Sequence, residues 1–173
     1  IWRTKLPVES TRDGSWDTYG SHTYMRIEDK AHQVFASFEE TAILPFGGWK
    51  QSIERQQDWM HTLATYIPAF PYYPPEFAYM RQPHTQTPLL LAGKNEYGGR
   101  ILVLAADVDR RYGQAAIPDH GNLLASAVRW VHSAAPEYTV IGKGYIASVL
   151  YKRASGLLLH LINLSGANVW PGF

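Results

Sequence analysis

The clearest structural signal in this sequence is Pro88-Leu89-Leu90-Leu91-Ala92, then a turn with glycines at 93, 98 and 99, then Arg100-Ile101-Leu102-Val103-Leu104-Ala105-Ala106. Two apolar runs of strand length on either side of a glycine-containing turn predict a β-hairpin. The second run is apolar throughout, which is typical of a strand covered on both faces, as in α/β domains. Asp107 then marks the carboxyl end of that strand.

The segments before the hairpin predict further strands and few helices. Residues 23–27, 41–46 and 59–67 have the β-branched, aromatic and apolar composition of strands. Residues 34–38 carry apolar side chains at a spacing that suits one or two helical turns. The first twenty residues are polar and interrupted by glycine, so they predict a loop.

One longer helix is predicted after Pro118. Leu123, Ala127 and Val131 recur every four residues and form one apolar stripe. Asp119 stands immediately before this pattern and is the predicted N-cap.

The character of the chain changes after residue 135. Three short β patterns, separated by glycine-containing turns, cover residues 138–141, 145–151 and 157–164. They predict a small antiparallel unit of three strands. The expected domains are therefore residues 1–135, with the hairpin and the helix, and residues 136–173, the start of a β domain.

Composition excludes several classes of protein. The chain has 173 residues, 46% of them hydrophobic, and a net charge of +1, so no strong field points to nucleic acid as a partner. The absence of cysteine excludes disulfides, thiolate metal sites and a cysteine nucleophile. No apolar run reaches the roughly 20 residues of a membrane helix. The expectation is a soluble protein, of bacterial cytoplasmic location, with no cofactor.

Several unusual strings occur in a particular order along the chain. They are Tyr24-Met25-Arg26-Ile27, Leu44-Pro45-Phe46-Gly47-Gly48, Pro74-Pro75-Glu76-Phe77-Ala78-Tyr79, Asp107-Val108-Asp109-Arg110, Pro118-Asp119-His120, Ala127-Val128-Arg129-Trp130 and Leu159-His160-Leu161-Ile162-Asn163-Leu164. Together they resemble the region downstream of the catalytic barrel in a group of bacterial glycoside hydrolases. That region is similar to the trimerisation domain of the family forty-two beta-galactosidases.

The resemblance implies both a fold and a role. The fold would be α/β: a partial flavodoxin-like, class I glutamine amidotransferase-like domain, followed by the start of a small antiparallel β domain. The first part of that domain and the whole catalytic barrel would precede Ile1, and no catalytic residue of the family has a matching position here. The implied partners are the missing portion of the parent chain and further copies in a homo-oligomer.

Asp107 and Asp109 form the best candidate acid pair. A glycosidase holds two carboxyl groups about 5 to 10 Å apart across the sugar, and two residues at the end of one strand with this spacing would point the same way. Arg110 follows at once, so an ion-paired loop anchor is the alternative. We therefore treat these three residues as candidates for ligand contact and not for catalysis.

The seven histidines show no pair or cluster with metal-ligand spacing. The sequence accordingly predicts no metal site. His120, next to Asp119 at the predicted helix start, is the histidine with the best claim to a functional role, and polar capping is the alternative.

The segment from Phe70 to Tyr79 combines aromatic side chains with prolines that exclude a regular helix. Flat rings stack on the C–H faces of sugars, so Tyr72, Tyr73 and the neighbouring Glu76 are candidates for carbohydrate contact. The same residues would also suit a subunit interface or packing within the chain. The sequence thus predicts a non-catalytic accessory and oligomerisation region of a glycoside hydrolase, with a stand-alone carbohydrate-binding module as the alternative.

Overall fold

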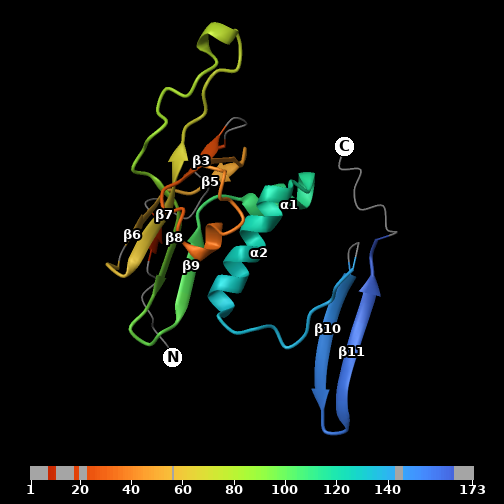
Figure 1. Cartoon of the computed structure of the whole chain (residues 1–173). Helices are drawn as coiled ribbons and strands as arrows, with labels where there is room; N and C mark the ends of the chain where they lie inside the picture. The colour runs from red at the N-terminus through yellow and green to blue at the C-terminus, as the bar shows by residue number, and fades with distance from the viewer. Residues whose placement is uncertain (1–7, 11–17, 20–22, 56, 143–145, 166–173) are drawn as a thin grey trace. The chain divides into compact units, whose positions relative to one another are not determined.

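The computed structural model describes residues 8–10, 18–19, 23–55, 57–142 and 146–165 (Figure 1). Contacts between Cα atoms divide the chain into two compact units, Ile1–Ser133 and Ala134–Phe173. The first unit contains a β-sheet with helices packed against it, and the second contains a β-hairpin.

The centre of the first unit is a five-stranded sheet in which every neighbouring pair is antiparallel. In spatial order its strands are β4 (Ile43–Pro45), β3 (Tyr24–Ile27), β7 (Met60–Ile67), β8 (Pro88–Lys94) and β9 (Arg100–Leu104). Strands β8 and β9 form the hairpin that the sequence predicts, and a turn at Asn95 to Gly99 joins them.

Strand β8 is the most deeply buried strand of this sheet. Leu89, Leu90 and Leu91 are fully buried, whereas every residue of β9 is only partly buried. The prediction that the second run, residues 101–106, is covered on both faces is therefore wrong for β9. Strand β8 has neighbours on both sides in the sheet, while β9 lies at its edge.

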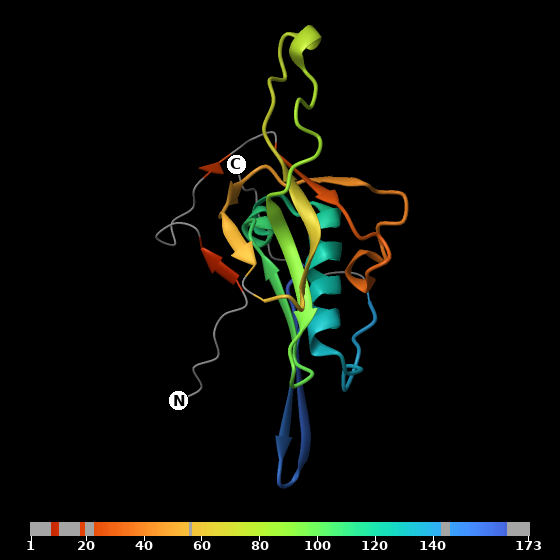
Figure 2. The same ribbon diagram turned by 90° about the vertical axis from the view of Figure 1, so that its left-hand side faces the viewer.

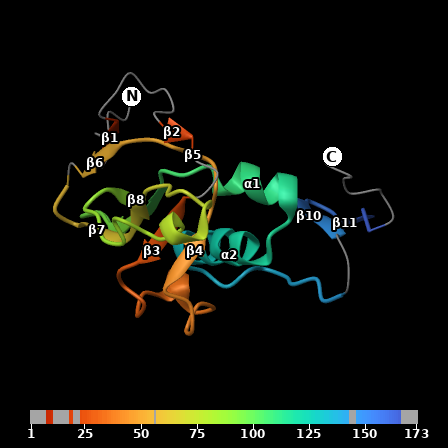
Figure 3. The same cartoon turned by 90° about the horizontal axis from the view of Figure 1, so that it is seen from above.

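Two short ribbons accompany the sheet along one side of the first unit (Figure 3). They pair β1 (Val8–Ser10) with β6 (Ile53–Arg55) and β2 (Thr18–Tyr19) with β5 (Trp49–Lys50). A bridge between Lys50 and Ala106 connects β5 to the chain that leaves β9. The described part of the first twenty residues thus forms strands, contrary to the loop that the sequence predicts.

Two α-helices follow the sheet, α1 (Val108–Ala115) and α2 (Pro118–His132), and α2 packs beside β9 (Figure 2). The predicted apolar stripe is correct for Leu123 and Ala127, which are buried, but wrong for Val131, which is 41% exposed; Trp130 is buried in its place. The N-cap of α2 is Ile117 and not Asp119, because Pro118 takes the first helical position that its fixed φ favours. The helical turn predicted at residues 34–38 is one turn of 3₁₀-helix that begins one residue earlier, η1 (Gln33–Phe35), against which α2 also packs.

The predicted fold class is wrong. A flavodoxin-like, amidotransferase-like domain needs parallel strands joined by crossover helices, whereas all pairs in this sheet are antiparallel and both α-helices come after the last strand. Strand accounts for 36% of the described residues and helix for 21%. The first unit is a mostly β domain with two helices added at its C-terminal end.

The described part of the second unit contains one hairpin, β10 (Ile146–Arg153) paired with β11 (Gly156–Asn163). Residues 138–141 do not form the predicted third strand. The side chains of β11 are exposed along its whole length, and Ile146, Val149 and Tyr151 of β10 are exposed too.

Candidate functional site

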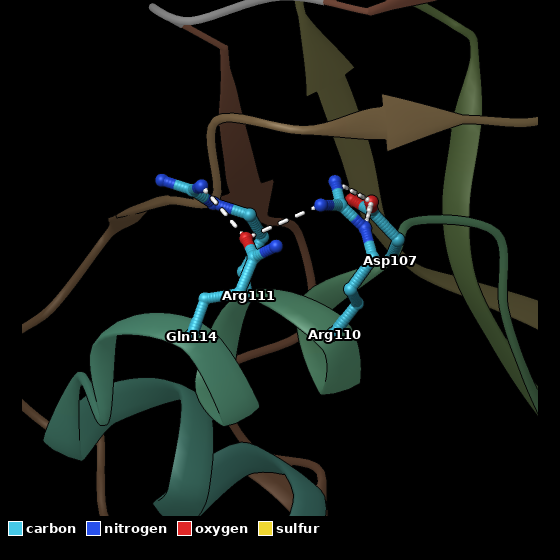
Figure 4. A network of polar contacts seen from close by, with 4 residues as sticks. All are labelled: Asp107, Arg110, Arg111 and Gln114. Atoms are coloured by element: carbon cyan, nitrogen blue, oxygen red, sulfur yellow. Dashed lines mark hydrogen bonds and ion pairs between the residues drawn. The ribbon is translucent and has the colours of Figure 1, made fainter. Parts of the chain in front are cut away.

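Asp107 lies at the junction between the sheet and α1, where the sequence predicts a ligand contact. Its carboxylate is buried, its Oδ2 accepts a hydrogen bond of 2.7 Å from Nε of Arg110, and the Nη2 atom of Arg110 completes the ion pair (Figure 4). The chain becomes helical at Val108, so the strand geometry that would align Asp107 with Asp109 does not continue, and Asp109 is exposed. The structure therefore gives Asp107 the alternative role, a loop anchor paired with Arg110.

Arg110 and Arg111 share one acceptor on the same helix. Nη1 of each arginine donates a hydrogen bond of 3.2 Å to Oε1 of Gln114 (Figure 4). The network of Asp107, Arg110, Gln114 and Arg111 thus fixes the first two turns of α1 to the end of the sheet. The backbone supports the same junction, since the Asp107 amide donates to the Trp49 carbonyl at 3.1 Å.

Three polar atoms near this network are buried without a hydrogen-bond partner among the described residues: Asp107 Oδ1, Arg111 Nε and His120 Nδ1. Nε2 of His120 lies 2.7 Å from the Pro45 carbonyl oxygen. A carbonyl only accepts, so Nε2 carries the proton and joins α2 to β4. His120 is therefore a buried structural link between these elements.

A small cavity of about 120 Å³ adjoins this region and is lined by residues of β3, β4, Arg111 and Ile117. A volume of this size has room for a few water molecules but not for a sugar residue. The predicted site residues Asp107, Arg110 and His120 do not line this cavity, and their contacts are those of a structural junction.

The predicted aromatic loop, residues 70–79, is the central part of a longer loop, residues 68–87, which joins β7 to β8 and extends away from the sheet (Figures 1 and 2). Its base is fixed: Nε of Arg26 donates to the Pro83 carbonyl at 2.6 Å, and the ring of Tyr24 stacks on Phe70 at 5.6 Å. Its tip contains one turn of 3₁₀-helix, η2 (Pro75–Phe77).

The aromatic side chains at the tip of this loop are largely exposed. Tyr72, Tyr73, Phe77 and Tyr79 are 71%, 77%, 52% and 55% exposed. Glu76 is exposed beside them, and the guanidinium of Arg81 lies over the Tyr79 ring at 5.7 Å. Most of the surface of these four rings is therefore open to a binding partner.

A second, larger cavity was not predicted from the sequence. Its volume is about 600 Å³, and we call it the Trp59 cavity. Its walls come from the turn after β3 (Asp29 and 31–33), from Trp59, His61 and Leu63 at the start of β7, from residues 92–94 of β8, from Arg100 of β9 and from Trp130 of α2. These residues are spread over a hundred positions, so no local motif could have indicated the cavity.

Aromatic and cationic groups are held rigidly around the Trp59 cavity. Nη1 of Arg100 donates to the Trp130 carbonyl at 2.8 Å, and its guanidinium lies 5.5 Å from the centre of the Trp130 ring. The imidazole of His32 also contacts that ring, at 5.1 Å between centroids. Trp59 lies directly against Gly93, whose missing side chain makes room for it.

His32 is a neutral hydrogen-bond donor in this cavity. Its Nδ1 accepts the amide proton of Val34 at 3.3 Å, so the ring proton is on Nε2. Burial lowers the pKa of His32 below its ordinary value; Asp29 opposes this shift, and His61 adds to it. The imidazole is therefore uncharged near neutral pH.

Within the described residues, no group of three or more histidine and carboxylate side chains is arranged to hold a metal ion. Neither of the described α-helices has the length and apolar character that crossing a membrane requires. Comparisons with models of protein families, with curated proteins and with solved structures find no match to this chain.

Proposed function

We propose that this chain is a non-catalytic accessory region of a glycoside hydrolase and that it serves in assembly of the enzyme. The sequence strings that occur along the chain in the same order as in the glycoside hydrolase region support the enzyme class. The observation that carries the assembly role is the loop of residues 68–87, which holds Tyr72, Tyr73, Phe77 and Tyr79 out in solvent. Exposed aromatic clusters of this kind are enriched at protein interfaces.

The loop is suited to binding because little freedom remains for it to lose. Prolines at 71, 74 and 75 restrict its backbone, and its base is hydrogen-bonded to β3 through Arg26. Tyrosine has few rotatable bonds, so ordering it on binding is less unfavourable than ordering a long flexible side chain. An interface built on these rings would gain most of the free energy of burying them.

A second copy of this chain is the partner that we propose for the loop. Its tip carries Glu76 and Arg81, which have opposite charges, so two copies related by a twofold axis can pair each with the other. The net charge of +1 produces no long-range repulsion between copies.

The polar junction at α1 supports a role without catalysis. Asp107 is buried and paired with Arg110, while Asp109 is exposed in the first turn of α1. A glycosidase needs one carboxyl group that stays protonated and a second that is ionised across the sugar. These two aspartates do not form such a pair.

Carbohydrate contact by the same loop is the second candidate function. Tyr72 and Tyr73 are 71% and 77% exposed, and Glu76 beside them can accept hydrogen bonds from sugar hydroxyls. Both functions predict loss of binding when the rings are removed, but they differ in the partner.

Sedimentation velocity and calorimetry distinguish the two functions. We expect the chain to self-associate and the double variant Tyr72→Ser/Tyr73→Ser to weaken self-association at least about tenfold. Tyr97→Ser is the matched control, because Tyr97 is 84% exposed but lies in the β8–β9 turn. If the protein is monomeric and titration with oligosaccharides releases heat that the double variant does not release, carbohydrate binding is the function and assembly is refuted. A monomer without such binding would refute both.

A further inference from the structure

We propose that the Trp59 cavity is a binding site for a small ring-shaped organic anion, the chemical class of sugar acids and sugar phosphates. The cavity lies among β7, β8, β9 and α2, whereas the proposed assembly loop consists of residues 68–87. The two proposals therefore rest on different residues and can fail independently.

The size and the apolar walls of the cavity fit a ligand with a compact body. Its volume of about 600 Å³ lies within the range of roughly 300–1,000 Å³ that is usual for small-molecule sites. Trp59, Leu63 and Ala92 supply apolar surface. A flat or ring-shaped body can pack against such a wall, as sugar rings do on indoles.

The charged groups around the cavity favour an anion. Lys94 and Arg100 are cationic, and among the described residues of the lining Asp29 is the one carboxylate. One oxygen of Asp29 already accepts the Ala31 amide proton at 3.1 Å. Two cations against one partly occupied carboxylate leave an excess of positive charge, which an acidic ligand would neutralise.

The hydrogen-bond donors in the cavity are positioned before any ligand arrives. Arg100 is held by Trp130 through one N–H group and by stacking on its ring, and in the described part of the chain its other N–H groups form no hydrogen bond. A guanidinium has five N–H groups in a planar fork, which matches the paired oxygens of carboxylates and phosphates. Nε2 of His32 adds a neutral donor. Preorganised donors of this kind reduce the entropy lost on binding.

The test is a titration of the full chain, followed by two-dimensional ¹H–¹⁵N NMR, with glucuronate, glucose 6-phosphate and glucose. The indole signal of Trp59, assigned with Trp59→Phe, reports on the cavity. We expect at least one of the two anions to shift this signal and to bind at least about tenfold more tightly than glucose. The anion with the higher affinity identifies the acidic group as carboxylate or phosphate.

Two charge reversals provide the matched comparison. Lys94→Glu changes an exposed residue of the cavity wall and should weaken anion binding at least about tenfold. Lys30→Glu makes the same change at an exposed residue that does not line the cavity, and it should have a much smaller effect. Equal affinity for glucose and both anions, no shift of the Trp59 indole with any of the three, or equal losses in the two variants would overturn the proposal.

Discussion

Replacing Gly93 by alanine tests the packing that forms the wall of the Trp59 cavity. A Cβ atom at this position would lie 2.2 Å from the Trp59 carbonyl oxygen and 2.8 Å from Cε3 of its indole ring. Neither contact can persist, and the carbonyl belongs to backbone that cannot turn aside like a side chain. Gly93 pairs with Met60 across the β7–β8 ladder, so relief requires the two strands to separate at this end.

The expected change follows from two opposing terms. Overpacking of a core position costs about 1–3 kcal/mol, and replacing glycine by alanine restricts the unfolded chain and returns about 0.4–1 kcal/mol. The free energy of unfolding should therefore fall by about 1–2 kcal/mol in Gly93→Ala. Displacement of Trp59 should also weaken anion binding in the same variant.

Urea denaturation followed by circular dichroism measures this difference. The control is Gly113→Ala in α1, where a Cβ atom would meet nothing within 4 Å and the substitution should raise stability by about 0.5–1 kcal/mol. A Gly93→Ala protein as stable as the unmodified chain would refute the described contact between Trp59 and β8.

Three further predictions concern the junction at α1, the His32 ring and the core. Arg110→Ala should lower the free energy of unfolding by about 1–3 kcal/mol, because it leaves the buried Asp107 carboxylate without its cation. Arg129→Ala, on the exposed face of α2, should change the free energy of unfolding by less than about 0.5 kcal/mol. Urea denaturation compares the two variants, and equal losses of stability would count against the junction. Burial lowers the pKa of His32 in the folded state, so the unfolded chain binds the proton more readily. The neutral His32 ring therefore contributes stability above pH 6.5, and this stability is lost as the pH falls below 6.5. An NMR titration of the ring with a midpoint above 6.5 would contradict this. Leu90→Ala should cost about 2–5 kcal/mol in thermal or urea unfolding, since Leu90 is fully buried in β8, and a loss below about 1 kcal/mol would disprove its place in the core.

Local patterns predicted the elements of this protein better than their arrangement. The hairpin of β8 and β9 and the burial of Leu123 and Ala127 in α2 follow from the spacing of apolar residues, which depends only on neighbours in the chain. The direction in which strands pair is a long-range property. A run that is apolar throughout, such as 101–106, is equally compatible with a parallel strand and with an antiparallel one next to a helix.

The candidate site was predictable only where its residues lie close together in the sequence. Asp107 and Arg110 lie three positions apart, and their ion pair is the structural alternative that the sequence analysis kept open. The contact between His120 and Pro45 joins residues from distant elements. The Trp59 cavity does the same, because its Asp29 and Trp130 come together only after the sheet has formed. No spacing rule reaches across such separations.

The loop of residues 68–87 has a consequence for chain connectivity. Its two ends leave β7 and β8, which are adjacent, hydrogen-bonded strands. A cut in the backbone at the exposed tip therefore leaves the hydrogen bonds of the sheet intact. A protease that cleaves after Arg81 would leave two fragments that stay associated through the β7–β8 ladder. The same position is accordingly suited to new termini in a circular permutant, or to the insertion of a reporter peptide.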